Sequence, residues 1–270
     1  MSDAIKHECG IALVRLLKPL DYYIDKYGTA TYGLDKMYLL MEKQHNRGQD
    51  GAGVATIKLD VEPGHRYISR HRSNSSKPIK DIFDKINGKF QEIADTQPEK
   101  LRDPEWLKAN VSFVGELLLG HLRYGTFGGN NIEYCHPFLR QNNWKTRNLV
   151  LAGNFNLTNV DELFGLLLNL GQHPKEKADT ITIMEKIGHF LDEANDEIYY
   201  KHKDDFSKKE ITAKIEEELD LQEILVQSAK YWDGGYVMCG LFGHGDAFVL
   251  RDPAGIRPAH YYADEEVVVV

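Results

Sequence analysis

The sequence predicts an α+β fold in which sheets and helices form separate layers. Strand-like apolar runs are interspersed with clustered helical patterns, without the strict strand–helix alternation of a parallel α/β fold. The chain has 270 residues, of which 42% are hydrophobic and 27% charged, so it can bury a substantial core. We therefore expect an ordinary globular protein made of one large domain or two small ones.

The N-terminal part is predicted to hold two strands with a helix between them. Residues 9–14 form a short apolar run typical of a buried strand, and residues 54–59 return to that pattern. Residues 34–44 place apolar side chains at helical spacing, and Gly48 is a natural stop for this helix. The next segment, 60–112, is expected to be an insertion on the surface because it is strongly charged.

Within that charged segment, residues 79–94 are predicted to form an amphipathic helix, and the short basic stretch 65–72 to form a solvated turn. The remainder of the chain predicts five more strands and three helices. The strands are expected at 117–122, 149–152, 236–242, 247–250 and 267–270, and the helices at 160–170, 180–194 and 208–231.

Composition excludes several classes of function. The 33 Lys+Arg and 41 Asp+Glu residues give a formal net charge of −8, which argues against a nucleic-acid-binding protein. Cys9, Cys135 and Cys239 form neither a CxxC pair nor an even set, which favours a reducing, cytoplasmic location. The sequence has no apolar run of about 18 residues, no secretory signal, no phosphate loop and no metal-binding motif, so we predict neither a membrane span nor a metal site.

Four polar segments rich in glycine follow predicted strands or helices. Glycine permits tight turns and a close approach of the backbone to a ligand. Arg123 carries a guanidinium group that can bind a carboxylate with two parallel hydrogen bonds, and Asn154 can donate an amide hydrogen to a developing oxyanion. Each segment alone is also what a structural turn looks like. The four read RGQDGAG at 47–53, GHLRYGT at 120–126, GNFNLTN at 153–159 and RDPAGIRP at 251–258.

Taken in order, these segments resemble the class II glutamine amidotransferases, a family of N-terminal-nucleophile (Ntn) hydrolases. The resemblance begins at Cys9-Gly10-Ile11, includes Ala178-Asp179-Thr180 and covers about residues 9–265. RGQD and RDPAGIRP resemble the amidophosphoribosyltransferases in particular. The resemblance implies a four-layer α/β/β/α sandwich of the Ntn type, with the active site between the strand ends of its two sheets and no cofactor in this segment.

By this resemblance, Cys9 is the nucleophile and its own α-amino group is the general base. A free α-amino group titrates near ~7.7–8.0, close to working pH, whereas an amide nitrogen has no basic lone pair. We therefore expect residues 1–8 to be a propeptide that is removed between Glu8 and Cys9. The alternative is that Cys9 is a small buried core residue on a strand.

The same resemblance assigns the substrate contacts. Arg123 would hold the α-carboxylate of glutamine and Asp179 its α-ammonium, while Arg47 shapes the nucleophile pocket. Tyr124 and Thr126 would belong to a loop over glutamine. The structural alternatives are a surface ion pair for Arg123 and a helix N-cap for Asp179.

The resemblance also assigns the oxyanion donors, which are the Asn154 side chain and the backbone N–H of Phe155. Phe155 stands where the family usually has glycine. A phenylalanine is strained where the backbone needs a positive φ. Either the turn adopts an allowed conformation here, or the oxyanion hole is impaired.

The implied function is the glutaminase half of an amidophosphoribosyltransferase, whose ammonia converts phosphoribosylpyrophosphate to phosphoribosylamine in the first step of purine synthesis. Residues 266–270 are expected to start the strand that leads into a phosphoribosyltransferase domain, which would bind phosphoribosylpyrophosphate and Mg²⁺. The full-length protein is expected to be a homo-oligomer. Two alternatives stay open: the glutaminase domain of another class II amidotransferase, and a catalytically silent domain that binds glutamine or serves assembly.

Overall fold

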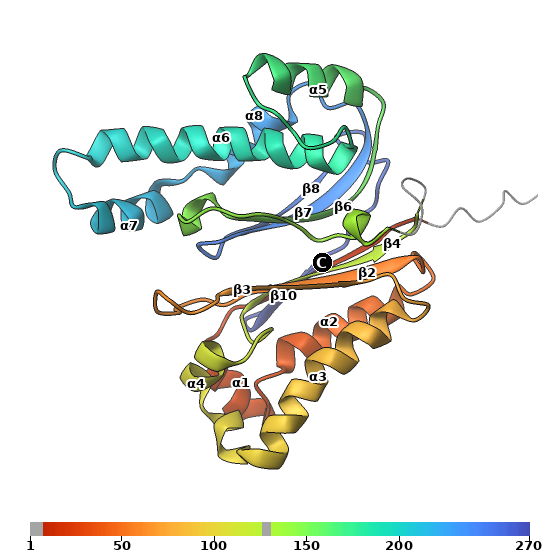
Figure 1. Ribbon diagram of the computed structural model, residues 1–270, viewed down its shortest axis with the longest axis vertical. Helices are drawn as coiled ribbons and strands as arrows, with labels where there is room; N and C mark the ends of the chain where they lie inside the picture. The colour runs from red at the N-terminus through yellow and green to blue at the C-terminus, as the bar shows by residue number, and fades with distance from the viewer. Residues whose placement is uncertain (1–7, 126–130) are drawn as a thin grey trace, which may run out of the picture.

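Two antiparallel sheets are stacked between two layers of helices, as predicted (Figure 1). The computed structural model describes residues 8–125 and 131–270. The first sheet has the order β3 (Ile68–Ser73), β2 (Gly51–Ile57), β4 (Leu117–Arg123), β1 (Gly10–Leu16), β10 (Val267–Val269) and β9 (Tyr262–Ala263). The second has the order β5 (Phe138–Arg140), β6 (Leu149–Leu157), β7 (Gly234–Phe242) and β8 (Ala247–Arg251).

Each sheet is covered on its outer face by four helices (Figure 1). The first sheet is covered by α1 (Leu20–Tyr27), α2 (Tyr32–Lys43), α3 (Pro78–Thr96) and α4 (Pro104–Asn110). The second is covered by α5 (Val160–Asn169), α6 (Asp179–His202), α7 (Lys208–Glu218) and α8 (Leu221–Ala229). None of these helices has an apolar stretch sufficient to span a bilayer.

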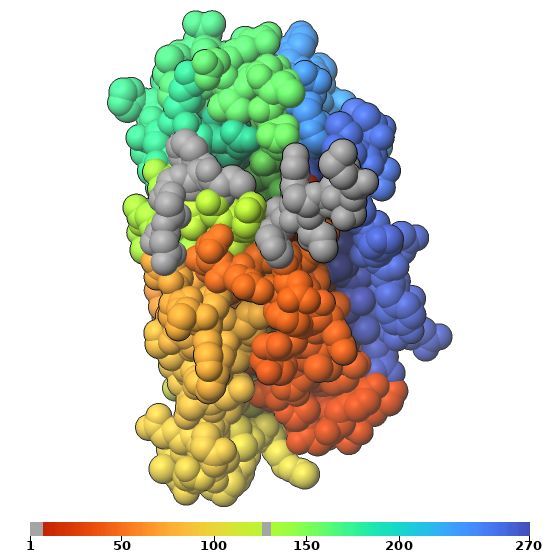
Figure 2. All heavy atoms as spheres, turned by 90° about the vertical axis from the view of Figure 1, so that its right-hand side faces the viewer, coloured from red at the N-terminus to blue at the C-terminus, as the bar shows by residue number. Residues whose placement is uncertain are grey.

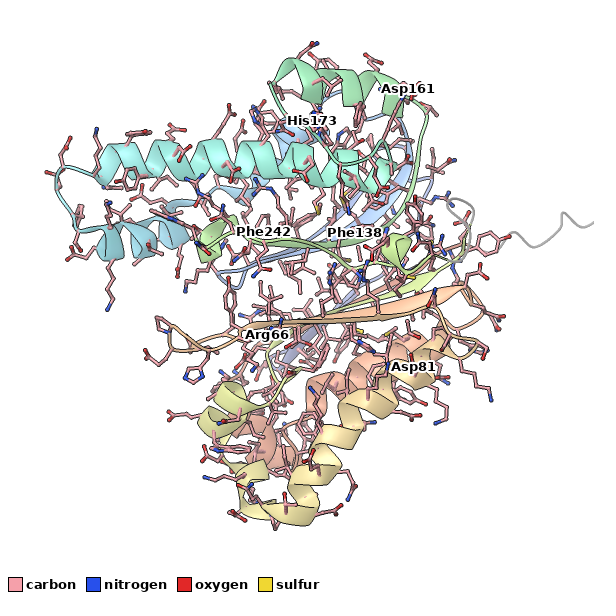
Figure 3. All side chains as sticks on the ribbon, viewed as in Figure 1. Arg66, Asp81, Phe138, Asp161, His173 and Phe242 are labelled. Carbon is pink, nitrogen blue, oxygen red and sulfur yellow. The ribbon has the colours of Figure 1, made fainter. Side chains whose placement is uncertain are left out.

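The inner strands are buried on both faces, which explains their unbroken apolar sequences. Every residue of β2 and of β4 is buried, because one face meets the helices and the other meets the second sheet. Between the sheets, Leu13, Leu119 and Val150 pack with Cys239, which is fully buried in β7 as expected. Phe138 and Phe242 lie on the second sheet beneath α6 and belong to the core on its outer face (Figure 3).

The prediction that residues 60–112 form a surface insertion is wrong. The stretch expected to be a solvated turn contains β3, which pairs with β2 along its whole length, from Ile57↔Ile68 to Ala52↔Ser73. Edge strands commonly carry charged side chains, and here the basic residues 70–72 lie between the buried Ser69 and Ser73. The helix α3 buries Ile82, Phe83 and Ile86 against the first sheet, so the segment completes the outer layer.

The C-terminal strand predicted at 267–270 forms within the first sheet. It runs antiparallel to β1 with Val14 opposite Val269, and Leu13 and Val270 exchange backbone hydrogen bonds of 3.1 and 3.0 Å. Figure 2 shows this blue C-terminal segment running down beside the orange and red N-terminal half. The segment therefore supports β1, the strand that follows Cys9, and its continuation into a further domain stays a prediction.

Gly53 offers a test of how β2 supports the second half of the molecule. A Cβ added there would lie 2.0 Å from the carbonyl oxygen of His136 and 2.9 Å from Pro137 Cδ. The backbone at His136 cannot move aside at a low energetic cost. We therefore expect Gly53→Ala to lower the free energy of unfolding by about 1–3 kcal/mol in urea denaturation. The control is Gly88→Ala in α3, which meets no heavy atom within 4 Å and should be stabilising by up to about 1 kcal/mol. Equal effects of the two substitutions would contradict the steric argument.

Candidate active site

Cys9 immediately precedes β1, at the point where the neighbouring strand β4 ends. Gly10 pairs with Leu122, so Cys9 lies where β4 ends at Arg123, and the backbone N–H of the next residue, Tyr124, donates to Cys9 Sγ at 3.4 Å. Burial raises the pKa of the Cys9 thiol above its ordinary value of 9.0. The thiol is therefore protonated at neutral pH and needs a general base before it can act as a nucleophile.

A cleft of about 710 Å³ opens beside Cys9, between the ends of the two sheets. It is lined by residues that are far apart in the sequence, from β4, β6, the start of α6 and the segment after β8. Six of the eight predicted site residues line it: Cys9, Arg123, Tyr124, Asn154, Phe155 and Asp179. The fold thus brings them together, while the role of each stays a prediction.

Of the other two predicted residues, Arg47 lies near the cleft and Thr126 falls outside the described residues. The Arg47 side chain is exposed, and its Nη2 lies 3.5 Å from a carboxylate oxygen of Glu8. For metal binding, residues 8–125 and 131–270 contain no group of three His, Cys, Asp or Glu side chains arranged to hold an ion.

Arg123 and Asp179 bring opposite charges into the cleft. Arg123 ends β4 and is only 4% exposed, so the alternative of a surface ion pair is wrong. Asp179 is the first residue of α6, but the N-cap position belongs to Ala178. The Asp179 carboxylate instead accepts the N–H of Leu157 at 3.2 Å. Burial raises the pKa of Asp179 above its ordinary value of 3.8, which marks a carboxylate whose charge is incompletely compensated.

Phe155 lies in a strand, although the sequence predicts a turn at 153–159. Residues 153–157 continue β6, where Phe155 pairs with Tyr236 of β7. Among the described residues other than glycine, a positive φ occurs only at Asp60, Phe113 and Tyr231. Phe155 therefore adopts an allowed conformation, and the strain that a phenylalanine would suffer in a left-handed turn does not arise.

The backbone N–H of Phe155 faces the open edge of β6. The strand β5 covers that edge only as far as Leu151. Beyond it, the N–H groups of Gly153 and Leu157 donate away from β7, to His136 Nδ1 and Asp179 Oδ2, each at 3.2 Å. Because backbone groups alternate sides along a strand, the N–H of Phe155 points to the same edge, which borders the cleft.

Two buried histidines hold the peptide next to Asn154. His121 Nε2 lies 3.2 Å from the carbonyl oxygen of Gly153, and His136 Nδ1 accepts the N–H of the same residue. Burial lowers the pKa of His121 to about 3 and that of His136 well below 6.5, so both rings are neutral at neutral pH. With Nδ1 as an acceptor, the proton of His136 is on Nε2, 3.1 Å from Thr180 Oγ1. The two histidines therefore fix the backbone of β6 immediately before Asn154.

Sequence reasoning missed Glu8 and Arg257 as residues of the cleft. The Glu8 carboxylate forms an ion pair with Arg257 and accepts a hydrogen bond from Asn154 Nδ2 at 3.1 Å. Arg257 belongs to the RDPAGIRP segment, a motif that by itself assigns no role to this arginine. The two histidines were also missed, and only His121 had a signal, its place in GHLRYGT.

The position of Arg257 is set by a buried aspartate. Asp252 is 1% exposed and accepts the backbone N–H groups of Ile256 at 2.7 Å and Arg257 at 2.9 Å. Burial alone would raise the pKa of Asp252, but these hydrogen bonds keep it below its ordinary value of 3.8. Asp252 therefore folds the segment into a turn that places Arg257 in the wall of the cleft.

No model of a known protein family matches the sequence, but individual proteins do. The chain is 25% identical to the amidophosphoribosyltransferase of Methanocaldococcus jannaschii over 233 residues, which cover 86% of the chain and 37% of that enzyme. It is 33% identical to the amidophosphoribosyltransferase of Archaeoglobus fulgidus over 222 residues, covering 82% of the chain and 35% of that enzyme. The chain thus spans about a third of the length of the curated relatives it matches.

A solved structure resembles the whole fold. The glutamine phosphoribosylpyrophosphate amidotransferase from B. subtilis matches with a TM-score of 0.55 and 22% sequence identity, over 96% of this chain and 41% of that one. This likeness confirms the four-layer sandwich of the Ntn type. The protein is a homologue of the amidophosphoribosyltransferases and matches the N-terminal part of those enzymes.

Proposed function

We propose that this protein is the glutaminase half of an amidophosphoribosyltransferase and releases ammonia from glutamine. The observation that carries the proposal is the cleft, in which the fold gathers Cys9, Arg123, Asn154 and Asp179 from separate segments. The names of the relatives support the use of that ammonia on phosphoribosylpyrophosphate. Since the chain spans about a third of those relatives, we assign the phosphoribosyl transfer to a part outside these residues.

The charges of the cleft suit an α-amino acid. Glutamine carries a carboxylate and an ammonium on one carbon, and the cleft offers the Arg123 guanidinium and the Asp179 carboxylate. A buried arginine can bind a carboxylate with two parallel hydrogen bonds, and the ammonium would compensate the charge of Asp179. This pair would orient glutamine with its side-chain amide toward Cys9.

The reaction needs one nucleophile, one base and two oxyanion donors. Cys9 Sγ attacks the side-chain carbonyl carbon, and the oxyanion that forms is stabilised by Asn154 Nδ2 and the N–H of Phe155. The C–N bond then breaks, ammonia leaves with the proton taken from the thiol, and a glutamyl thioester remains. Water attacks the thioester, which releases glutamate and restores the thiol.

The base in this scheme is the α-amino group of Cys9. The raised pKa of the buried thiol makes a base necessary, and a free α-amino group titrates near ~7.7–8.0. In the described chain that nitrogen forms the peptide bond with Glu8. We therefore propose that the active form begins at Cys9.

Ammonia release from glutamine tests the proposal when chains that begin at Cys9 are compared with the same chains carrying Cys9→Ala. Release by the former alone supports a glutaminase, and equal signals would exclude it. A silent glutamine-binding domain is the second candidate, and the observation that favours it is the Glu8 carboxylate on Asn154. Glutamine binding without turnover, in chains that begin at Cys9, would identify that second function.

Asp179→Asn separates substrate binding from stability. We expect the Kd or KM for glutamine to rise about 10²-fold, because a charge-assisted hydrogen bond to the ammonium is lost. The melting temperature at pH 7 should stay equal or rise, because the raised pKa of Asp179 means that its charged form is disfavoured in the folded state. Titration calorimetry and thermal unfolding measure the two effects. A lower melting temperature with unchanged affinity would show a structural role instead.

A further inference from the structure

The side chain of Glu8 is bound in the cleft by three groups from different parts of the fold. Its carboxylate forms an ion pair with Arg257, lies 3.5 Å from Arg47 Nη2 and accepts from Asn154 Nδ2 at 3.1 Å. The Arg257 side chain is only 14% exposed, and that of Glu8 is 31% exposed. The carboxylate is thus held by two guanidinium groups and an amide, a donor set that fits a carboxylate closely.

This donor set has its own support in the fold. The turn that carries Arg257 is held by Asp252 through backbone hydrogen bonds that do not involve Glu8. Asn154 is carried by the β6–β7 ladder, with Val237 as its partner. Arg257 and Asn154 are therefore placed by the fold itself and form a preorganised site for a carboxylate.

The position of the Glu8 carboxylate conflicts with the use of Asn154 in catalysis. The oxygen of Glu8 lies at the distance from Asn154 Nδ2 where the oxyanion of the reacting glutamine would lie, about 2.7–3.1 Å. A carboxylate bound at that distance competes with the oxyanion for Asn154 Nδ2 and repels it by charge. The presence of Glu8 therefore opposes the use of Asn154 by glutamine.

We propose that Arg257, Arg47 and Asn154 form a carboxylate-binding subsite, which the Glu8 side chain fills and thereby closes the cleft to glutamine. This inference rests on the proposed glutaminase function. It adds a ligand, the carboxylate that precedes the nucleophile, and a residue, Arg257, whose task is to hold it. Removal of Glu8 then has two effects at once, since it frees the α-amino group of Cys9 and opens the oxyanion position.

A binding experiment on the full chain tests this without relying on turnover. All variants carry Cys9→Ala, so that no thiol can cleave the chain, and glutamine is the titrant in calorimetry. Removal of the carboxylate by Glu8→Ala is expected to lower the Kd for glutamine by about tenfold to a hundredfold. Glutamine then no longer has to displace the Glu8 carboxylate from its charge-assisted contacts. The matched control is Glu92→Ala on the exposed side of α3, which should leave the Kd unchanged.

A double-mutant cycle assigns the effect to Arg257. With Glu8 present, Arg257→Gln should also lower the Kd, whereas in the Glu8→Ala chain the same change should alter it less than about twofold. Arg102→Gln, at an exposed position, is the control. If Arg257→Gln weakens glutamine binding in both chains, Arg257 holds the substrate and the inference is overturned.

Different results would overturn the carboxylate subsite and the glutaminase function. Equal glutamine affinity of the chains with and without the Glu8→Ala substitution would overturn the carboxylate subsite and leave the glutaminase function standing. A failure of both chains to bind glutamine, with melting temperatures that show them folded, would overturn the proposed function and the subsite with it.

Discussion

Ammonia release from glutamine is expected to rise in proportion to the fraction of chains that begin at Cys9, and to fall at least about 10³-fold in the Cys9→Ala variant. Both expectations come from one physical fact. The thiol is buried, which raises its pKa, and the nitrogen beside it is basic only when no acyl group is attached. A chain that keeps Glu8 therefore has a nucleophile without its base.

Intact-mass spectrometry and an ammonia assay on the same samples measure this relation. In chains that begin at Cys9, kcat/KM should increase with pH up to about 8, as the α-amino group loses its proton. Cys239→Ala is the control, because that thiol is buried between the sheets and lies outside the residues that line the cleft. Full activity in chains whose mass includes residues 1–8 would contradict the assignment of the base.

Asn154→Ala is expected to lower kcat by about 10²–10³-fold with little change in KM. One of the two oxyanion donors is lost, and the contribution of such a donor appears in the transition state rather than in the bound substrate. The second donor, the N–H of Phe155, is part of the backbone and remains. Steady-state kinetics on chains that begin at Cys9 separate the two parameters.

Asn169→Ala provides the matched control for that experiment. Asn169 is exposed at the end of α5, in the outer helical layer, and should leave both kcat and KM unchanged. A rise in KM without a fall in kcat for Asn154→Ala would mean that Asn154 binds the ground state of glutamine. In that case the oxyanion would need another donor.

Fold and site were predictable from the sequence to different extents. The apolar runs of β1, β4 and β7 and the helical pattern of α3 are local signals, and the structure contains all four elements close to their predicted bounds. The prediction of one helix over 208–231 was wrong, because Asp220 caps a new helix by accepting the N–H of Glu223 at 3.0 Å. Such a cap is a local signal that the charged pattern concealed.

The edge strand β3 and the extended conformation at Phe155 had no comparable signal. Each depends on hydrogen bonds to a strand elsewhere in the chain: β3 pairs with β2, and Phe155 pairs with Tyr236. The residue types in both stretches, basic in one and Asn- and Gly-rich in the other, favour turns when they are considered alone. Pairing with a partner strand outweighs that preference.

The sequence by itself determined the nucleophile candidate, the order of its polar segments and the layered class of the fold, because these depend on residue type and local spacing. Only the tertiary structure decided that Glu8 and Arg257 meet at Asn154, and that His121 and His136 hold Gly153. These contacts join residues more than 15 positions apart, and in the case of Glu8 and Arg257 they join an early and a late part of the chain. No local pattern encodes them, since they exist only once both sheets have formed and stacked.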